Sequence, residues 1–511
     1  MLARIITHVA ALPPARHVSM NRMALLHTGR ATAAGASAIL SKANVQSTAA
    51  LRFPGAPASS EGVSIAPLGY GSPATFIKDT QVIAEVKAAV LTRGSNLVQT
   101  HFSYSGDPAN DENLGRLGES IAINELLSED DVPREGLVIS AILDEDVLSH
   151  DRPSLSVQDR LSSVVLHEHL EQILRLLDVE VLDLLIVRLP ADLFTLPAAA
   201  AAVLIQGAIA GLEASVQDNL LQGYGFALPS AFMTSPHDED INLSNDRIHK
   251  FLSSVLLPHL QSGCVAIQRR TNLQEGHTFP SSSSFSWPAH IQWIGEFPLD
   301  IHVKHGTRSK PLHLKSTQGA HNGVEVAAKL KESFAFALNV ETKYHHELFP
   351  AHSALLPPPD DVAWAHILAA QHAQFDNLTE WTYIRETQIQ PRLEALLQQL
   401  QGIEATKDFS FAYSVAMRTL LRHFDVSIDM VATNHNDRIL TSVVEGPLKS
   451  DSEHDRTIED IGLLVAQSCR PVDVVLVAQE VPASSMQPRR KLSTTTLDSI
   501  QALESQWNDL E

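Results

Sequence analysis

Cysteine is scarce in this chain, which has only two among its 511 residues, Cys264 and Cys469. Two thiols cannot supply the four ligands of a structural zinc site, and they give no disulfide framework. The cysteine content therefore excludes a disulfide-stapled secreted fold and is compatible with a reducing compartment.

Acidic residues are missing from the first 60 positions, and Glu61 is the first one. The same stretch has six basic residues and is rich in Ala and Ser. This composition is typical of a mitochondrial transit peptide, and a disordered basic tail that binds nucleic acid is the alternative. We therefore expect residues 1–60 to be a cleaved leader and the mature protein to lie in the mitochondrial matrix.

Long apolar runs and an excess of positive charge are also lacking. The Ala-rich segment 196–212 predicts a buried or weakly amphipathic helix, and no run reaches membrane-spanning length. Without the six basic leader residues, the formal charge falls from −21 to −27. A body this acidic disfavours broad contact with phosphate backbones, so we expect protein partners, no membrane span and no direct nucleic-acid contact.

Short apolar runs that alternate with helical patterns are what the chain does have. The candidate strands are residues 63–68, 97–100, 137–142, 182–187, 223–227, 264–268, 291–297 and 426–431. Eight strands with intervening helices predict an α/β fold, a (β/α)8 TIM barrel with a parallel sheet.

The interval between the last two predicted strands is too long for one βα unit. It has helical periodicity and the Pro-rich stretch LFPAHSALLPPPDD. Because barrel loops tolerate growth, we predict a large helical insertion here. The predicted organisation is a leader over 1–60, the first part of the barrel over 61–300, the helical insertion over 301–410, the last helix and strand over 411–480, and a flexible tail over 481–511.

The segment LEQILRLLDVEVLDLLIVRLP, residues 170–190, indicates an amphipathic helix, a turn and a buried strand. It resembles the aldo-keto reductase pattern in which the strand reads Val-Asp-Leu-x-x-x-His-x-Pro. Asp183 and Pro190 match this pattern, but Arg188 stands where the family keeps its catalytic histidine. The resemblance covers roughly residues 63–444 and implies a barrel of aldo-keto reductase type, whose members reduce carbonyls with NADPH.

A second segment, GSNLVQTHFSYS at 94–105, resembles the family's G-I-N-F-x-D-T-x-x-x-Y-G. The resemblance places Tyr104 at the general-acid tyrosine, Gln99 at the aspartate and, after the strand LVISAI, Ile142 at the lysine. An isoleucine cannot lower the pKa of a neighbouring phenol. The phenol of Tyr104 is therefore expected to keep its free pKa of about 10. With Arg188 counted, three of the four catalytic positions are replaced, which predicts lost activity. The alternative is that Arg188 supplies a cation near Tyr104 and preserves weak activity.

The cofactor positions implied by the resemblance are mixed. Gln268, in VAIQRRTNL, matches the glutamine that holds the nicotinamide amide. Thr433 and Arg438, in VATNHNDRI, match the loop that grips the 2′-phosphate. Glu296 takes the place of the aromatic ring that stacks on nicotinamide, and QGYGFAL lacks the amide-binding Ser and Asn.

Together these features predict a mitochondrial aldo-keto-reductase-like pseudoenzyme that acts as a structural subunit of a larger assembly of mitochondrial proteins. Two alternatives stay open: an active or weak NADPH-dependent carbonyl oxidoreductase, and an NADPH-binding sensor without turnover. We expect no metal and no required cofactor, with NADPH as the one possible ligand.

Overall fold

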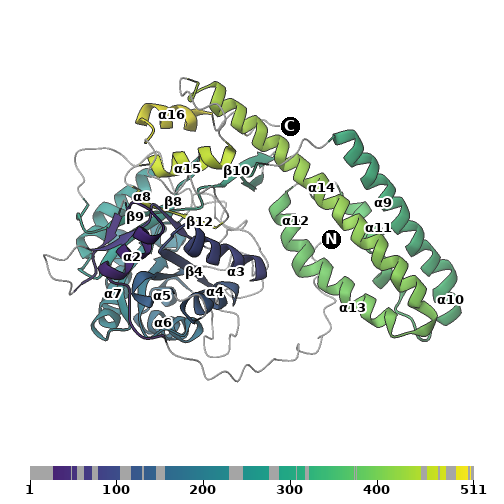
Figure 1. The fold of residues 1–511 in the computed structure, drawn as a ribbon, viewed down its shortest axis with the longest axis horizontal. Coiled ribbons are helices and arrows are strands. Elements are labelled where there is room, and N and C mark those ends of the chain that lie inside the picture. The colour runs from purple at the N-terminus through teal and green to yellow at the C-terminus, as the bar shows by residue number, and fades with distance from the viewer. Residues whose placement is uncertain are drawn as a thin grey trace.

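A closed barrel carries a long helical arm in this protein (Figure 1). The computed structural model describes residues 27–47, 49–54, 62–71, 79–103, 117–128, 132–144, 156–229, 245–275, 287–305, 308–316, 322–372, 375, 377–449, 457–469, 472–478, 491–503 and 507. The barrel strands are β3 (Leu68–Tyr70), β4 (Leu97–Ser103), β5 (Val138–Asp144), β6 (Leu182–Arg188), β7 (Leu221–Ala227), β8 (Cys264–Arg270), β9 (Gln292–Glu296) and β12 (Val474–Val477). They pair in parallel in that order and β12 closes on β3, which confirms the predicted (β/α)8 barrel.

The helices around the barrel, apart from the single-turn α5, bury apolar side chains in its outer core. They are α3 (Asp79–Lys87), α4 (Leu117–Ser128), α5 (Val157–Arg160), α6 (Ser163–Leu177), α7 (Ala198–Gln217), α8 (Asn245–Phe251) and α15 (Ile458–Ser468). In α6 the predicted face, which includes Leu170 and Ile173, is buried. Among the described helices, α7 is long and apolar enough to cross a membrane. It connects β6 to β7 and buries Ile205 and Ile209 in the barrel's outer core, as expected for a crossover helix.

The N-terminal end of the barrel is closed by residues that the sequence predicted to be a leader. Helix α2 (Ala33–Lys42) packs there, and β1 (Ala49–Leu51) pairs antiparallel with β2 (Val63–Ile65). Leu51 and Phe53 are buried in the same core as the side chains that line the barrel. The described residues of this segment, 27–47 and 49–54, are therefore folded onto the barrel and not disordered, because a lack of acidic residues reports on charge and not on burial. Residues 1–26 and 55–61 lie outside the described part of the chain.

Two predicted strands are placed differently by the structure. The first one, 63–68, divides into β2 and the start of the barrel strand β3. The predicted last strand, 426–431, lies inside the 39-residue helix α14 (Lys407–Glu445). Phe424 and Ile428 are buried four residues apart, so this β-branched run is one turn of a longer helical pattern.

The last barrel strand is β12, which the sequence prediction missed. The predicted flexible tail is folded in part, because α16 (Thr494–Ala502) buries Leu497 and Ile500 beside α14 and α15. The apolar run at 474–477 was the available signal, and it lies outside the aldo-keto reductase resemblance at 63–444.

A large helical segment separates the last two barrel strands, as predicted. It begins with the hairpin of β10 (Asp300–His305) and β11 (Arg308–His313). Its helices are α9 (Gly323–Lys343), α10 (Phe349–His352), α11 (Trp364–Gln371), α12 (Leu378–Ile384), α13 (Gln390–Gln401) and α14. These helices form the arm, which has a hydrophobic core of its own between residues 330 and 428. Farther along, α14 buries Ile439 and Val443 with α15 and β12, so one helix of about 58 Å joins the arm to the barrel.

Three helical segments widen into a π-helical turn two residues before a proline. The turns Leu252–Leu256, Tyr344–Leu348 and Arg385–Ile389 are followed by the prolines at 258, 350 and 391. A proline ring clashes with the carbonyl four residues earlier and donates no hydrogen bond to it. At the second and third prolines the wider turn accommodates both effects and an α-helix follows, whereas at the first the chain passes into the short 3-10 turn Leu257–His259.

Candidate functional site

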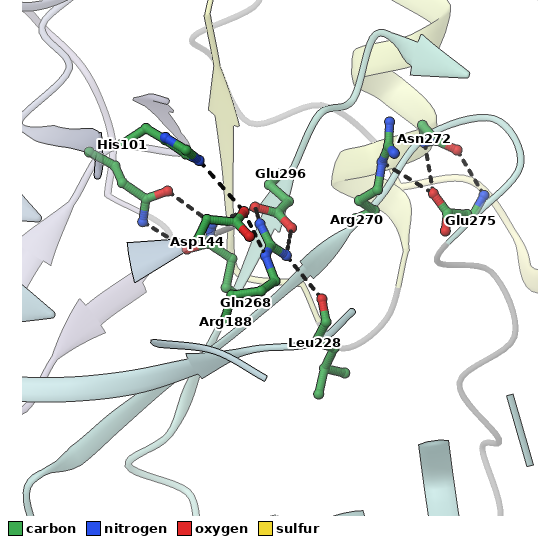
Figure 2. A network of polar contacts seen from close by, with 10 residues as sticks. His101, Asp144, Arg188, Leu228, Gln268, Arg270, Asn272, Glu275 and Glu296 are labelled. Atoms are coloured by element: carbon green, nitrogen blue, oxygen red, sulfur yellow. Dashed lines mark hydrogen bonds and ion pairs between the residues drawn. The ribbon is translucent and has the colours of Figure 1, made fainter. Parts of the chain in front are cut away.

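A buried polar cluster lies at the carboxyl ends of the barrel strands, the end at which TIM-barrel enzymes place their chemistry (Figure 2). Five strands contribute one residue each: Gln99 from β4, Asp144 from β5, Arg188 from β6, Gln268 from β8 and Glu296 from β9. None of the five is more than 7% exposed. The structure thus brings together Gln99, Arg188 and Gln268, which the sequence singled out from distant segments.

The guanidinium of Arg188 is the centre of this cluster. Its Nη1 and Nη2 donate to the two carboxylate oxygens of Glu296 at 2.5 and 2.9 Å. Its Nε donates to Oδ2 of Asp144 at 2.9 Å, and Nη1 also donates to the carbonyl oxygen of Leu228 at 2.9 Å. A bidentate pair between arginine and a carboxylate is the strongest geometry available to these groups. Arg188 is therefore fully committed to residues of the protein itself.

The charges of the cluster support one another. Burial alone would lower the pKa of Arg188, but the carboxylates of Asp144 and Glu296 raise it above its ordinary value. Burial would raise the pKa of Asp144, yet Arg188 and His101 hold that pKa below its ordinary value. His101 lies on β4 with its Nε2 3.7 Å from Oδ2 of Asp144. The ionised forms of Asp144 and Arg188 are thus favoured at neutral pH.

The two glutamines form a reciprocal pair beside Glu296. The amide nitrogen of Gln268 donates to Oε1 of Gln99 at 2.9 Å and to Oε2 of Glu296 at 2.7 Å. The amide nitrogen of Gln99 donates back to Oε1 of Gln268 at 2.8 Å. Ile142, at the lysine position of the resemblance, is 2% exposed and offers no charge or proton. The side-chain amide of Gln268, which the resemblance assigns to nicotinamide binding, is therefore occupied by neighbouring side chains.

The residues at this end of the barrel do not fit a bound nicotinamide ring. Glu296, in place of the stacking aromatic residue, carries a carboxylate that is held by Arg188. Gln268 directs its amide at Gln99 and Glu296. A nicotinamide carboxamide could bind Gln268 only after these contacts had opened.

Two predicted cofactor residues lie away from the cluster, on α14. The hydroxyl of Thr433 donates to the carbonyl of Asp429 at 2.8 Å, a bond within one helical turn. Arg438 is exposed one turn farther along the same helix. The helical conformation contradicts the interpretation of this segment as a phosphate-binding loop after a barrel strand. Tyr104, the predicted general acid, lies outside the described residues.

A small hollow, partly open to solvent, adjoins the cluster and is lined in part by His101, Ile142, Phe297 and His313. Phe297 follows Glu296 with a φ of 52°, a left-handed conformation that bulky side chains rarely adopt. This residue turns the chain from β9 into the hairpin of β10 and β11. There Nδ1 of His313 lies 2.8 Å from Oδ1 of Asp300.

Asp144 and His101 belong to the site, although the sequence prediction did not single them out. His101 is two residues after Gln99, and Asp144 is two residues after Ile142. Alternate residues of a strand face the same side, so this spacing could have placed both in the barrel mouth. Their pairing with Arg188 depends on contacts between strands and has no local signal.

Comparison with known proteins gives structural neighbours only. No family model and no curated protein matches this chain. It is similar to a holo aldo-keto reductase from Bacillus halodurans, at 14% identity over 53% of this chain and 73% of that one, with a TM-score of 0.30. An aldo-keto reductase from Klebsiella pneumoniae in complex with NADP and acetate is similar at 13% identity over 49% and 68%, with a TM-score of 0.30. A glycerol dehydrogenase from Gluconobacter oxydans is similar at 12% identity over 90% and 96%, with a TM-score of 0.40.

Proposed function

We propose that this protein is a pseudoenzyme of aldo-keto reductase type, located in mitochondria, where it serves as an interaction subunit of a larger assembly. The observation that carries the proposal is the contact between Arg188 and Glu296. This ion pair lies in the barrel mouth, where the family resemblance would place a carbonyl substrate beside nicotinamide. Its charges and hydrogen bonds are satisfied without any ligand.

The hydrogen bonding of the cluster also favours a structural role. Buried charges are costly unless each is paired and hydrogen-bonded. Here one guanidinium bridges two carboxylates, and the second carboxylate also accepts from Gln268. An active site needs donors and acceptors that can bond to the reacting atoms. In this cluster the donors and acceptors bond to one another instead.

We expect purified protein to reduce aldehydes with NADPH at no more than the background rate. Tyr104→Phe should leave that rate unchanged, because Ile142 provides no charge to activate a phenol at position 104. The measurement is NADPH consumption with a panel of aldehydes, together with NADPH titration by fluorescence. Turnover that Tyr104→Phe abolishes would defeat the pseudoenzyme proposal, and binding without turnover would favour a sensor.

A weak reductase is the second candidate, and one observation favours it. His101 lines the hollow, and its Nε2 lies 3.7 Å from Oδ2 of Asp144. A protonated His101 could donate the proton on Nε2 to a carbonyl substrate in the hollow. In that case His101→Gln would abolish NADPH-dependent turnover while Tyr104→Phe left it intact. The pair of variants therefore separates the two candidates.

The interaction role is supported by the arm and by the charge of the chain. The arm has its own core yet exposes Val324 at 81% and Phe336 at 45% of their surfaces. The formal charge of −21 favours basic partner proteins over nucleic acid.

We expect the tagged full chain to co-fractionate from mitochondria in a complex much larger than the 55.7 kDa monomer. Val324→Asp with Phe336→Asp should reduce this co-fractionation, because charges would enter an apolar contact. Val203→Asp on α7, where the wild-type side chain is 66% exposed, is the matched control. Recovery in the cytosol, or migration as a monomer at low salt, would refute the assembly role.

A further inference from the structure

One face of α14 carries exposed residues with an ordered change of charge. Asp408, Phe411, Val415, Arg418 and Arg422 follow one another at steps of three or four residues, so they share one side of the helix. Asp408, Arg418 and Arg422 are exposed, and Phe411 and Val415 are 72% and 43% exposed. The stripe is thus acidic at its start, apolar at its centre and basic at its end.

The opposite side of the same helix is packed. Phe409 lies 4.9 Å from Tyr344, at the end of α9, and 5.6 Å from Tyr413, measured between ring centroids. Tyr413 is fully buried and donates a hydrogen bond to Glu341 of α9 at 3.0 Å. These contacts fix the orientation of α14 about its own axis. Phe411 is therefore held facing outward by the packing of the opposite side of the helix.

The order of residues along the stripe is symmetric about position 413. Phe411 and Val415 are two residues from this centre, Asp408 and Arg418 are five, and Glu404 and Arg422 are nine. Glu404 lies in the short turn Glu404–Thr406 that precedes α14, is 86% exposed and pairs there with Lys407. Within the described part of the chain, Arg418 and Arg422 have no ion-pair partner.

We propose that this face of α14 is a dimer interface for a second copy of the same chain. In an antiparallel pair of α14 helices related by a two-fold axis at position 413, Asp408 of one protomer faces Arg418 of its partner. Phe411 of one protomer lies against Val415 of its partner at the centre. Each contact occurs twice, and opposite charges meet on both sides of the apolar centre, whereas a parallel pair would place like charges together.

A second copy fits this stripe better than an unrelated partner does. The chain carries a formal charge of −21, so two copies repel each other unless their local charges interleave. In the antiparallel arrangement, two identical chains place the acidic end of one stripe against the basic end of the other. The stripe from Asp408 to Arg422 spans only about 21 Å, so its contact falls below the roughly 1,000 Å² of stable complexes. The dimer is therefore weak and depends on concentration.

The test is a charge swap, followed by sedimentation equilibrium of the full chain over a wide concentration range. Asp408→Arg alone should weaken dimerisation about tenfold, because it sets arginine against arginine at two sites. Arg418→Asp alone should do the same. The double variant Asp408→Arg with Arg418→Asp should restore wild-type association, since the pairs are exchanged and not lost. Phe411→Ser should weaken the dimer about a hundredfold.

Controls separate this contact from general charge effects. Asp408→Arg lowers the net negative charge, which by itself would favour association, so a weakening points to the local pair. Glu325→Arg on α9 makes the same charge change at an exposed position and should not weaken the dimer. Circular dichroism checks that each variant is folded. A monomer at every concentration, or a double variant weaker than both single variants, would overturn the proposal. Neither outcome depends on whether the barrel binds NADPH.

Discussion

Arg188→Ala is expected to lower the free energy of unfolding of the barrel by about 3–5 kcal/mol at pH 7. The substitution removes the shared partner of Asp144 and Glu296, and it leaves two buried carboxylates facing each other. Because the arm has a separate core, a global melting curve could mix two transitions. Native-state hydrogen exchange at the amides of β5 and β6 reports the stability of the barrel directly.

The penalty should depend on pH with a defined sign. In the wild type, Arg188 holds the pKa of Asp144 below its ordinary value, so this stabilisation is present above about pH 4 and is lost as the pH falls through the native pKa. Without Arg188, burial raises the pKa of Asp144, so the variant is penalised as the pH rises. The stability difference between the two proteins should therefore shrink toward pH 4.

A neutral version of the cluster provides the matched control. The triple variant Arg188→Met, Asp144→Asn and Glu296→Gln removes all three charges and keeps an acceptor for Gln268 at position 296. Replacing a whole buried ionic group is often nearly neutral, whereas removing one member is costly. If Arg188→Ala and the triple variant were equally unstable, loss of packing and not unpaired charge would be the cause.

The sequence predicted the members of this cluster better than their contacts. Motif spacing placed Gln99, Arg188, Gln268 and Glu296 at the ends of barrel strands, because strand ends are fixed by local apolar runs. The ion pair between Arg188 and Glu296 joins residues 108 positions apart. Which side chains meet across a barrel depends on strand tilt and rotamers, and a single sequence carries no local record of either.

The failure at α14 has a different physical cause. The segment 426–431 has strand-like composition, but a helix is decided by the buried positions that flank it. Those positions, from Phe409 to Val443, extend across both the arm core and the barrel core. A window of six residues cannot detect a periodicity that only a 39-residue helix makes visible.

Deletion of residues 1–54 is expected to destabilise the barrel by more than about 5 kcal/mol, enough to prevent recovery of soluble protein. The deletion removes Leu51 and Phe53 from the barrel-lining core, and their absence exposes the interior to water. It also removes the backbone N–H of Ala31, which donates to Oδ1 of Asp183 at 2.8 Å. Asp183 is fully buried on β6. Its Oδ2 accepts hydrogen bonds from Nη1 of Arg134 and from the backbone N–H of Ile139 on β5, each at 2.8 Å, and so links the two strands.

Deletion of residues 1–26 alone is the matched comparison for the longer truncation. This shorter truncation should leave the stability unchanged, because α2, β1 and the contact of Ala31 with Asp183 are all retained. Two point substitutions give a finer comparison within one strand end. Leu51→Ala should cost about 2–5 kcal/mol because its side chain is buried, whereas Arg52→Ala should cost less than about 0.5 kcal/mol because its side chain is exposed. Urea unfolding of the full chain and its variants measures both. A chain lacking residues 1–54 that unfolds at the wild-type urea concentration would show that the N-terminal segment only covers the barrel and does not complete its core.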